Sequence, residues 1–192
     1  RSLNANNEMI WCNTTIYLIE SGGHLMGFVY VKNIEEKKRK ELELLRQSRI
    51  DPLTGLLNRA ACLQEINYLL KENGPEESAL LIIDVDNFKM VNDTFGHMYG
   101  DKVLAGIAYK LRDIFDEDAI VGRLGGDEFL IFMFHIPGED AVCHKAQIVA
   151  RELQTIQQEG ENQVVVTNSI GIAFSPRHGS RFQELYVKAD TA

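Results

Sequence analysis

Two pairs of acidic residues in this chain have a spacing suited to binding a divalent cation. Asp127 and Glu128 follow two glycines between two apolar runs, a pattern that predicts a β-hairpin with carboxylates at its tip. Asp84 and Asp86 end another apolar run, 79–83. Two strands that end at one point could deliver their carboxylate oxygens to one cation. Since such cations clamp the transferring group of phosphate substrates, these residues indicate an enzyme that acts on nucleotides.

Helical and strand patterns alternate around these acids and predict an α/β fold, with a mixed central β-sheet flanked by helices. The expected helices are 58–72, 101–115, 139–159 and 181–189. The expected strands are 79–84, 120–124, 129–134 and 163–174.

The first 50 residues have a different character. Apolar runs at 14–20 and 24–32 flank the turn 21–23 and predict an antiparallel β-hairpin. Two strands alone are marginal in water, so we expect this hairpin to be the remnant of a larger sheet. Residues 35–50 contain good helix formers without Gly or Pro and predict a linker helix, which Asp51-Pro52 ends.

Within this linker, Leu42 and Leu45 share one face. A short two-helix seam and a solvated helix are both open interpretations, because fewer than three clean heptads are present. The predicted organisation is therefore a hairpin remnant at 1–34, a linker helix at 35–50 and an α/β domain at 51–192.

Composition limits the classes of partner. The chain has 28 acidic and 20 basic residues and a net charge of −8, and no Lys/Arg stripe with interleaved aromatics marks a groove, so we expect no nucleic-acid partner. A mononucleotide can still bind, because salt screens diffuse charge within roughly 10 Å. Three widely spaced cysteines predict reduced thiols in the cytoplasm. No apolar run approaches 18 residues, and a chain that starts at Arg1 suggests a fragment whose parent could be membrane-attached upstream.

Four motifs stand in order along the second part of the chain. They are DPLTGLLNR at 51–59, DVDNFKMVND at 84–93, GHMYGD at 96–101 and RLGGDEF at 123–129. This set resembles GGDEF domains, and the resemblance covers about three quarters of the chain. It implies diguanylate cyclase activity in bacterial second-messenger signalling, in which two GTP condense to cyclic di-GMP and two pyrophosphates. It also implies a fold like that of polymerase palms and nucleotide cyclases. Residues 27–34 and the helix after them resemble the last strands of a PAS sensor domain.

The residue chemistry assigns metal and catalytic roles at the acid pairs. Asp84 and Asp127 are the best candidates to hold two Mg²⁺ or Mn²⁺ ions per active site. The resemblance adds the carbonyl of Val85 as a ligand, makes Asp127 the proton acceptor and gives Glu128 an assisting role. A solvated turn is the alternative interpretation of these acids, and Asp86 stays ambiguous.

Other residues fit the nucleotide itself. Gly125 and Gly126 permit a tight turn that lets the main chain approach a bulky ligand. Lys89 can stabilise charge on the phosphates, which the resemblance also implies, and the alternative is a solvated loop lysine.

Recognition of guanine needs an acceptor for its imino and amino groups and a donor for its carbonyl oxygen. A carboxylate and an amide suit these roles, and Asp101 and Asn92 are the candidates. The resemblance places Phe88 and His97 in the nucleotide pocket, and His97 could instead cap a helix that begins near Gly100.

The chain also departs from the family pattern. The window for an Arg-x-x-Asp inhibitory site reads Asp116-Glu117-Asp118-Ala119, so we expect no product inhibition through that route. The family continues past Ala192 through a Lys and an Arg that bind the terminal phosphates, so we expect this fragment to bind GTP weakly.

One domain holds one GTP, and each 3'-hydroxyl must reach the phosphorus of the other molecule, so catalysis requires a homodimer. We expect the linker helix to transmit dimer geometry from the sensor part. One alternative is a non-cyclising module that binds GTP or a protein partner. Another is a related cyclase that uses ATP, against which Asp101 and Asn92 argue.

Overall fold

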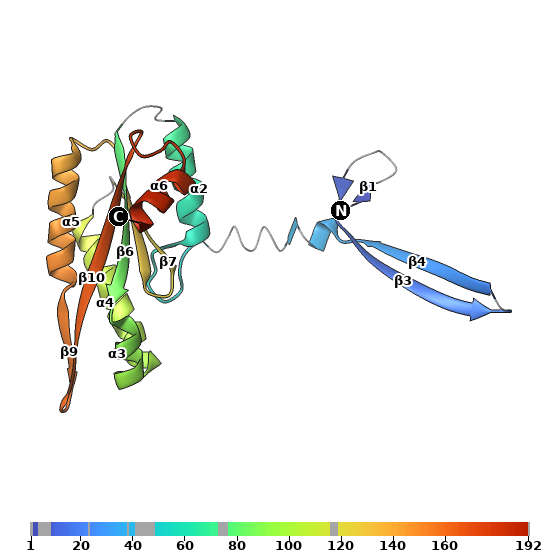
Figure 1. The fold of residues 1–192 in the computed structure, drawn as a ribbon, viewed down its shortest axis with the longest axis horizontal. Helices are drawn as coiled ribbons and strands as arrows, with labels where there is room; N and C mark the ends of the chain where they lie inside the picture. Colours follow the sequence, from blue (N-terminus) through green and yellow to red (C-terminus); the bar gives the residue numbers. More distant parts are fainter. Residues whose placement is uncertain are drawn as a thin grey trace. The chain divides into compact units, whose positions relative to one another are not determined.

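The computed structural model describes residues 2–3, 9–22, 24–37, 39–40, 49–72, 77–115 and 119–191. The chain divides into two compact units, Arg1–Ser48 and Arg49–Ala192, which are described separately below (Figure 1). No helix within these described ranges is both long enough and apolar enough to cross a membrane. The three cysteines are free thiols, as expected from their spacing.

The first unit contains the predicted β-hairpin. Strands β3 (Cys12–Ser21) and β4 (His24–Asn33) pair antiparallel over their whole length, which confirms the hairpin. The short strands β1 (Ser2–Leu3) and β2 (Met9–Ile10) form a separate antiparallel pair. The resemblance to a PAS domain rests on the sequence alone.

The predicted linker helix is only partly described. Residues 35–37 and 39–40 are helical, and residues 41–48 lie outside the described residues. The prediction that the helix continues to Ile50 is wrong, because the Asn58 N–H donates to the Arg49 carbonyl and Ile50 forms a β-bridge with Leu57. The chain is therefore already in the second unit at residue 49.

The second unit contains a six-stranded mixed sheet, which confirms the predicted fold class. Its strands are β5 (Leu57–Asn58), β6 (Ser78–Asp86), β7 (Ala119–Gly125), β8 (Glu128–Met133), β9 (Thr155–Glu159) and β10 (Asn162–Ser175). Their order is β5-β7-β8-β6-β10-β9. The β5–β7 pair is parallel and the other pairs are antiparallel. Strand β6 therefore lies in the middle of the sheet.

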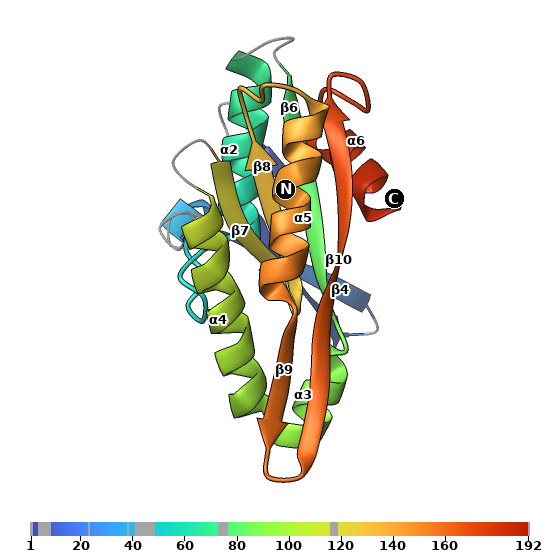
Figure 2. The same ribbon diagram turned by 90° about the vertical axis from the view of Figure 1, so that its left-hand side faces the viewer.

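Helices cover both faces of this sheet. On one face pack α2 (Arg59–Glu72) and α6 (Phe182–Asp190). On the other pack α3 (Phe88–Phe95), α4 (His97–Ile114) and α5 (Glu139–Leu153), and α4 and α5 lie in front of the sheet in Figure 2. Successive residues of β6 alternate between the two cores, with Leu80 and Ile82 on the α2/α6 face and Leu81 and Ile83 on the other. Burial on both faces explains why β6 is an unbroken apolar run.

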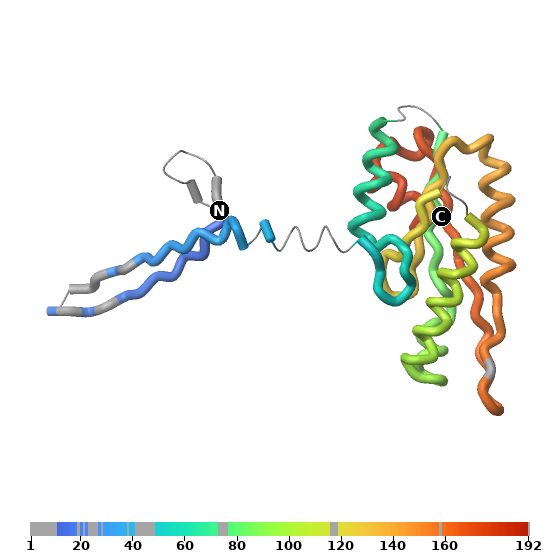
Figure 3. Tube along the Cα trace, turned by 180° about the vertical axis from the view of Figure 1, so that it is seen from behind, coloured from blue at the N-terminus to red at the C-terminus, as the bar shows by residue number. Residues whose placement is uncertain are grey.

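The long helix predicted at 139–159 is wrong beyond Leu153. Residues 155–159 form β9, which pairs with β10, through a turn that includes Gly160 at φ 61°. Gln and Glu are good helix formers, so local composition favoured a helix that tertiary pairing overrides. The β9–β10 hairpin extends past the end of α5 (Figure 3).

The helix predicted at 101–115 begins four residues earlier, and α3 precedes it. Gly96, at φ 85°, separates α3 from α4 and permits the sharp change of direction between them. Val103, Leu104, Ile107, Ala108 and Leu111 of α4 are buried, as the helical periodicity predicted.

Candidate active site

The end of β6 and the β7–β8 turn meet on the α2/α6 face of the sheet. Asp84 lies directly opposite Glu128 of β8 and directly opposite Ser169 of β10. Side chains of directly opposed residues in antiparallel strands point to the same face, so the carboxylates of Asp84 and Glu128 are neighbours. Asp127 precedes Glu128 in the turn. The structure thus brings together the two acid pairs that the sequence places 43 residues apart.

Two glycines shape the turn that carries Asp127. Gly125 has φ 144° and Gly126 has φ 55°, backbone conformations that residues with a Cβ rarely adopt. The pairing register between β7 and β8 shifts between Arg123 and Gly125. A bulge of this kind re-aims side chains at the end of a hairpin.

A hollow of about 500 Å³ lies on the same face, beside α6. It is lined by Ile82, Asp84, Glu128, Ser169, Ile170, Gly171, Ala189 and Asp190. Gly171 is required here, because a Cβ on it would lie 1.7 Å from the Ala189 carbonyl oxygen. The close approach of α6 to β10 adds Asp190 as a further carboxylate near Asp84.

These carboxylates repel one another. Burial raises the pKa of Asp84, and the charges of Asp127, Asp86 and Asp190 raise it further. Burial likewise raises the pKa of Glu128, with further contributions from Asp84, Asp190 and Asp127, and Arg59 only partly offsets them. A bound cation would relieve this repulsion.

The donor set fits a magnesium ion, since carboxylate oxygens are the ligands this hard cation prefers. In the described ranges, no three His, Cys, Asp or Glu side chains already surround one point. The two residues predicted from the sequence to hold the ion, Asp84 and Asp127, both belong to this cluster of carboxylates. The side chain of Val85 is buried in the α3/α4/α5 core, so only its backbone could contribute.

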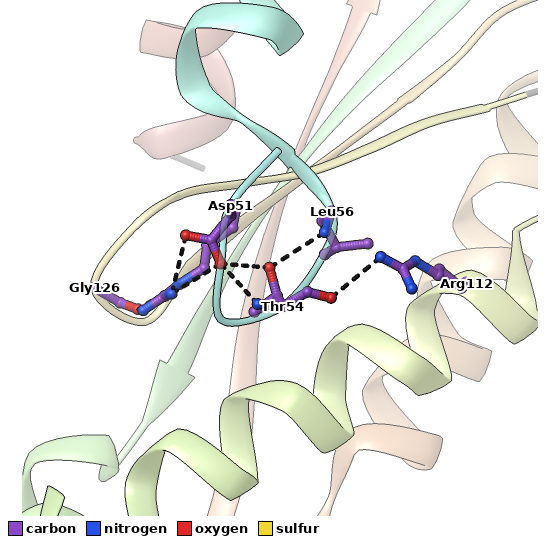
Figure 4. A network of polar contacts seen from close by, with 6 residues as sticks. Asp51, Thr54, Leu56, Arg112 and Gly126 are labelled. Atoms are coloured by element: carbon purple, nitrogen blue, oxygen red, sulfur yellow. Dashed lines mark hydrogen bonds and ion pairs between the residues drawn. The ribbon is translucent and has the colours of Figure 1, made fainter. Parts of the chain in front are cut away.

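A polar network holds the turn against the loop that follows residue 50 (Figure 4). The Arg123 Nε and Nη2 atoms donate to the Gly126 carbonyl at 3.0 and 2.6 Å. The Arg123 Nη1 atom donates to Asp51 Oδ1 and Oδ2 at 3.1 and 3.3 Å. Asp51 also accepts from the Thr54 N–H at 2.9 Å and the Thr54 hydroxyl at 2.6 Å. Arg112 completes the network by donating to the Thr54 carbonyl at 3.1 Å.

This network keeps Asp51 ionised. Burial acts to raise the pKa of Asp51, but the hydrogen bonds from Thr54 and Arg123 outweigh it and lower the pKa below its ordinary value. The sequence motifs contain these residues, yet spacing alone did not indicate that Asp51 and Arg123 pair. The opposite charges of Asp51 and Arg123, which lie in two separate motifs, were the sequence feature that could have predicted this ion pair.

The predicted guanine-binding residues gather where α3 meets α4. A Cβ on Gly100 would lie 2.0 Å from Asn92 Oδ1 and 3.2 Å from the Phe88 ring, so α3 and α4 approach closely at this glycine. Asp101 follows in α4 and is exposed, and Phe88 packs partly against the core. This corner begins two residues after β6 ends.

Two other predicted residues are exposed near this corner. Lys89 lies in the first turn of α3. His97 is the first residue of α4, with Gly96 at the cap position and no side-chain capping bond. The alternative that His97 caps a helix beginning near Gly100 is therefore wrong. Residues 116–118 of the inhibitory-site window lie outside the described residues.

Comparison with known proteins decides the family. Residues 48–192 match the family model described as diguanylate cyclase, GGDEF domain. The chain belongs to the GGDEF family. This GGDEF domain is 39% identical over 150 residues to the diguanylate cyclase DgcN of Escherichia coli K12, a match that covers 76% of the chain and 37% of that protein.

Other relatives carry different names. The chain is 32% identical over 160 residues to the cyclic di-GMP phosphodiesterase PdeR of Escherichia coli K12, which covers 83% of the chain and 24% of that protein. A crystal structure of a sensory box/GGDEF family protein from Caulobacter crescentus matches with a TM-score of 0.69 and 30% identity, over 76% of this chain and 95% of that one. The chain thus spans well under half the length of these two curated relatives.

Proposed function

We propose that this GGDEF domain is a diguanylate cyclase, which condenses two GTP molecules into cyclic di-GMP and two pyrophosphates. The observation that carries the proposal is the pairing of Asp84 with Glu128 across β6 and β8, beside the turn that holds Asp127. A relative named as a diguanylate cyclase supports it. The reaction would take place in the cytoplasm, where GTP is supplied.

The carboxylates would prepare the nucleophile. Two Mg²⁺ or Mn²⁺ ions held by Asp84, the Val85 carbonyl and Asp127 would supply Lewis-acid polarisation of the phosphates and acidify the attacking hydroxyl. Asp127 accepts the proton of the 3'-hydroxyl, and Glu128 assists it. The pKa of Glu128 is raised above its ordinary value, which favours its protonated form and suits a group that exchanges protons.

Other side chains bind and orient the substrate. Lys89, exposed in the first turn of α3, balances the charge that develops on the phosphoryl oxygens. Asn92 and Asp101 hydrogen-bond the guanine edge. Phe88 and His97 line the base pocket, and Gly125 and Gly126 let the turn lie against the nucleotide. Removing Asn92 or Asp101 would leave donors of the base unpaired and reduce discrimination for GTP.

Catalysis needs two chains. Each domain positions one GTP, so two active-site faces must meet for each 3'-hydroxyl to reach the other α-phosphorus in line. The homodimer is therefore the catalytic unit, and the linker at 35–50 sets how often the competent arrangement forms.

A second candidate function is a non-cyclising regulatory module. One relative favours it, because the name of that protein is that of a phosphodiesterase and not of a cyclase. The complete set of acids, with Lys89, argues against it, since a binding module has no need for a proton acceptor.

Product analysis tests the proposal. The full-length parent protein is incubated with Mg²⁺ and labelled GTP or ATP, and the products are separated. We expect labelled cyclic di-GMP from GTP alone. Unchanged nucleotide in both reactions would favour the regulatory module, and a product from ATP would assign a different cyclase.

A further inference from the structure

The last two residues of β6 have a sheet partner on one side only. Pairing between β6 and β8 stops at Asp84 and Glu128. Pairing between β6 and β10 continues to Asp86, which lies opposite Thr167. The position of Val85 and Asp86 therefore depends on their contacts with β10.

Side chains reinforce the pairing at this point. The Thr167 hydroxyl donates to Asp86 Oδ2 at 2.7 Å, and the Ser169 hydroxyl donates to Asp86 Oδ1 at 2.9 Å. The next residue, Asn87, donates from Nδ2 to the Val165 carbonyl at 3.1 Å. Asn87 has φ 63°, a left-handed conformation that Asn tolerates better than most residues. Three side-chain bonds thus tie the β6–α3 corner to one strand.

These bonds distinguish the two aspartates of β6. Both carboxylate oxygens of Asp86 accept a hydroxyl hydrogen bond. Ser169, although directly opposite Asp84, donates to Asp86 instead. Within the described part of the chain, no hydrogen bond is directed at the Asp84 carboxylate, which remains open to a cation.

We propose that Asp86 is a positioning residue for the reaction rather than a cation ligand, an inference that rests on the proposed function. Its bonds to Thr167 and Ser169 fix the end of β6. That end carries Val85, so it sets where the Val85 carbonyl meets the cation and where Lys89, three residues after Asp86, meets the phosphates. Residues that fix the position of metal ligands without binding the metal commonly affect its affinity.

Variants of the full-length parent protein separate the two roles. Asp86→Asn removes the charge but keeps the shape, and its amide can still bond both hydroxyls, one as acceptor and one as donor. Thr167→Val with Ser169→Ala keeps the charge of Asp86 and removes both hydroxyls. Thr155→Val is the matched control, because its hydroxyl lies on β9 and accepts from Gln157 instead.

The primary measurement is Mn²⁺ affinity in the presence of a non-hydrolysable GTP analogue, with free Mn²⁺ followed by electron paramagnetic resonance. We expect Asp86→Asn to bind Mn²⁺ within roughly threefold of wild type, a loss typical of one distant charge. The Thr167→Val/Ser169→Ala variant should bind about 10-fold more weakly, with a raised KM for GTP. The control should match wild type.

If Asp86 were a direct cation ligand, the losses of Mn²⁺ affinity in the two variants would have the reverse order. Loss of Mn²⁺ binding on the order of 100-fold in Asp86→Asn, with the hydroxyl variant unchanged, would overturn the proposal. A second double variant, Thr167→Ser with Ser169→Ala, keeps one of the two hydroxyls. It should recover part of the Mn²⁺ affinity, which a general loss of folding would not allow. The Mn²⁺ measurement needs no turnover, so it remains informative even if the wild type makes no cyclic di-GMP. Absence of cyclic di-GMP would contradict the proposed function and not the role of Asp86.

Discussion

Asp84 and Glu128 have carboxyl groups whose pKa values are raised because burial and neighbouring carboxylates disfavour their charged forms. Such a cluster destabilises the fold in the absence of a cation, and the cation site proposed here would therefore be one of the frequent conflicts between stability and function. Asp51 shows the opposite behaviour, since hydrogen bonds from Thr54 and Arg123 lower its pKa. The charged forms of Asp84 and Glu128 therefore destabilise the fold, whereas the charged form of Asp51 stabilises it.

Asp84→Asn should therefore stabilise the metal-free protein. The pKa of Asp84 lies above its ordinary value of 3.8 in the folded state, so the wild type loses stability as pH rises through that raised pKa. Asn does not titrate and escapes this loss. The carboxyl group of Asp84 is partly desolvated, but the residue as a whole is exposed and solvent screens its charge, so the gain at pH 7 should be at most about 1 kcal/mol. Thermal melts between pH 4 and 7 measure it, with exposed Asp113→Asn as control, and a variant no more stable than wild type at pH 7 would contradict the argument.

Asp51→Asn should show the opposite pH dependence. The folded pKa of Asp51 is lowered, so its contribution is complete above its ordinary value of 3.8 and is lost as pH falls through the folded pKa. We expect a deficit of about 1–3 kcal/mol at pH 7, because the variant loses a charged acceptor of Thr54 and Arg123. Urea unfolding from pH 7 to 3 checks this, and a deficit that does not change with pH would rule it out.

The residue types pointed to the cluster of carboxylates but not to the residues that support it. The two acid pairs and their glycine turn could be singled out from side-chain chemistry and motif spacing, and the structure places Asp84 beside Glu128. The pairing of Asp51 with Arg123 depends on two segments 72 residues apart, and the role of Asp86 depends on strand register. Neither is visible in local sequence.

At the scale of elements, two glycines decide how closely helices approach the site. A Cβ on Gly171 would meet the backbone of Ala189 in α6, which cannot move aside without shifting the helix. A Cβ on Gly100 would meet mainly the Asn92 side chain, which can rotate. Similar substitutions should therefore have different consequences.

We expect Gly171→Ala to destabilise the fold by about 1–3 kcal/mol through overpacking. Gly100→Ala should change stability little but raise KM for GTP about 10-fold, because it would displace Asn92 from the position in which we propose that it binds guanine. Gly106→Ala in α4 is the matched control, with nothing within 4 Å of its added Cβ, and should be neutral or stabilising by about 0.5–1 kcal/mol. Melts and steady-state kinetics test all three, and equal effects at the three positions would refute the packing argument.

The elements themselves were predicted with uneven success, for physical reasons. Strand β6 and helix α4 follow strong apolar patterns and were found. Helix α5 was extended to 159 because the Gln and Glu residues of β9 favour helix locally, whereas pairing with β10 makes this segment a strand. Helix α3 was missed because it is short and ends at Gly96.

In the whole molecule, the proposed reaction requires two chains to meet. Insertions within 35–48, before the second unit begins at Arg49, should change cyclase activity with helical periodicity. Two added residues rotate the following segment by about 200°, whereas four return it to within about 40° of its original direction. We expect the two-residue insertion to reduce activity about 10-fold or more and the four-residue insertion to retain more of it. Activity that is unchanged by every insertion would remove the linker from the mechanism.

The most direct test of the central claim is the rate of cyclic di-GMP formation by the full-length parent at saturating Mg²⁺, compared with its Asp84→Asn variant. The account predicts product from the wild type and a loss on the order of 10³-fold in the variant, although the variant is at least as stable. A wild type that leaves GTP intact, or a variant that turns over at the wild-type rate, would contradict it.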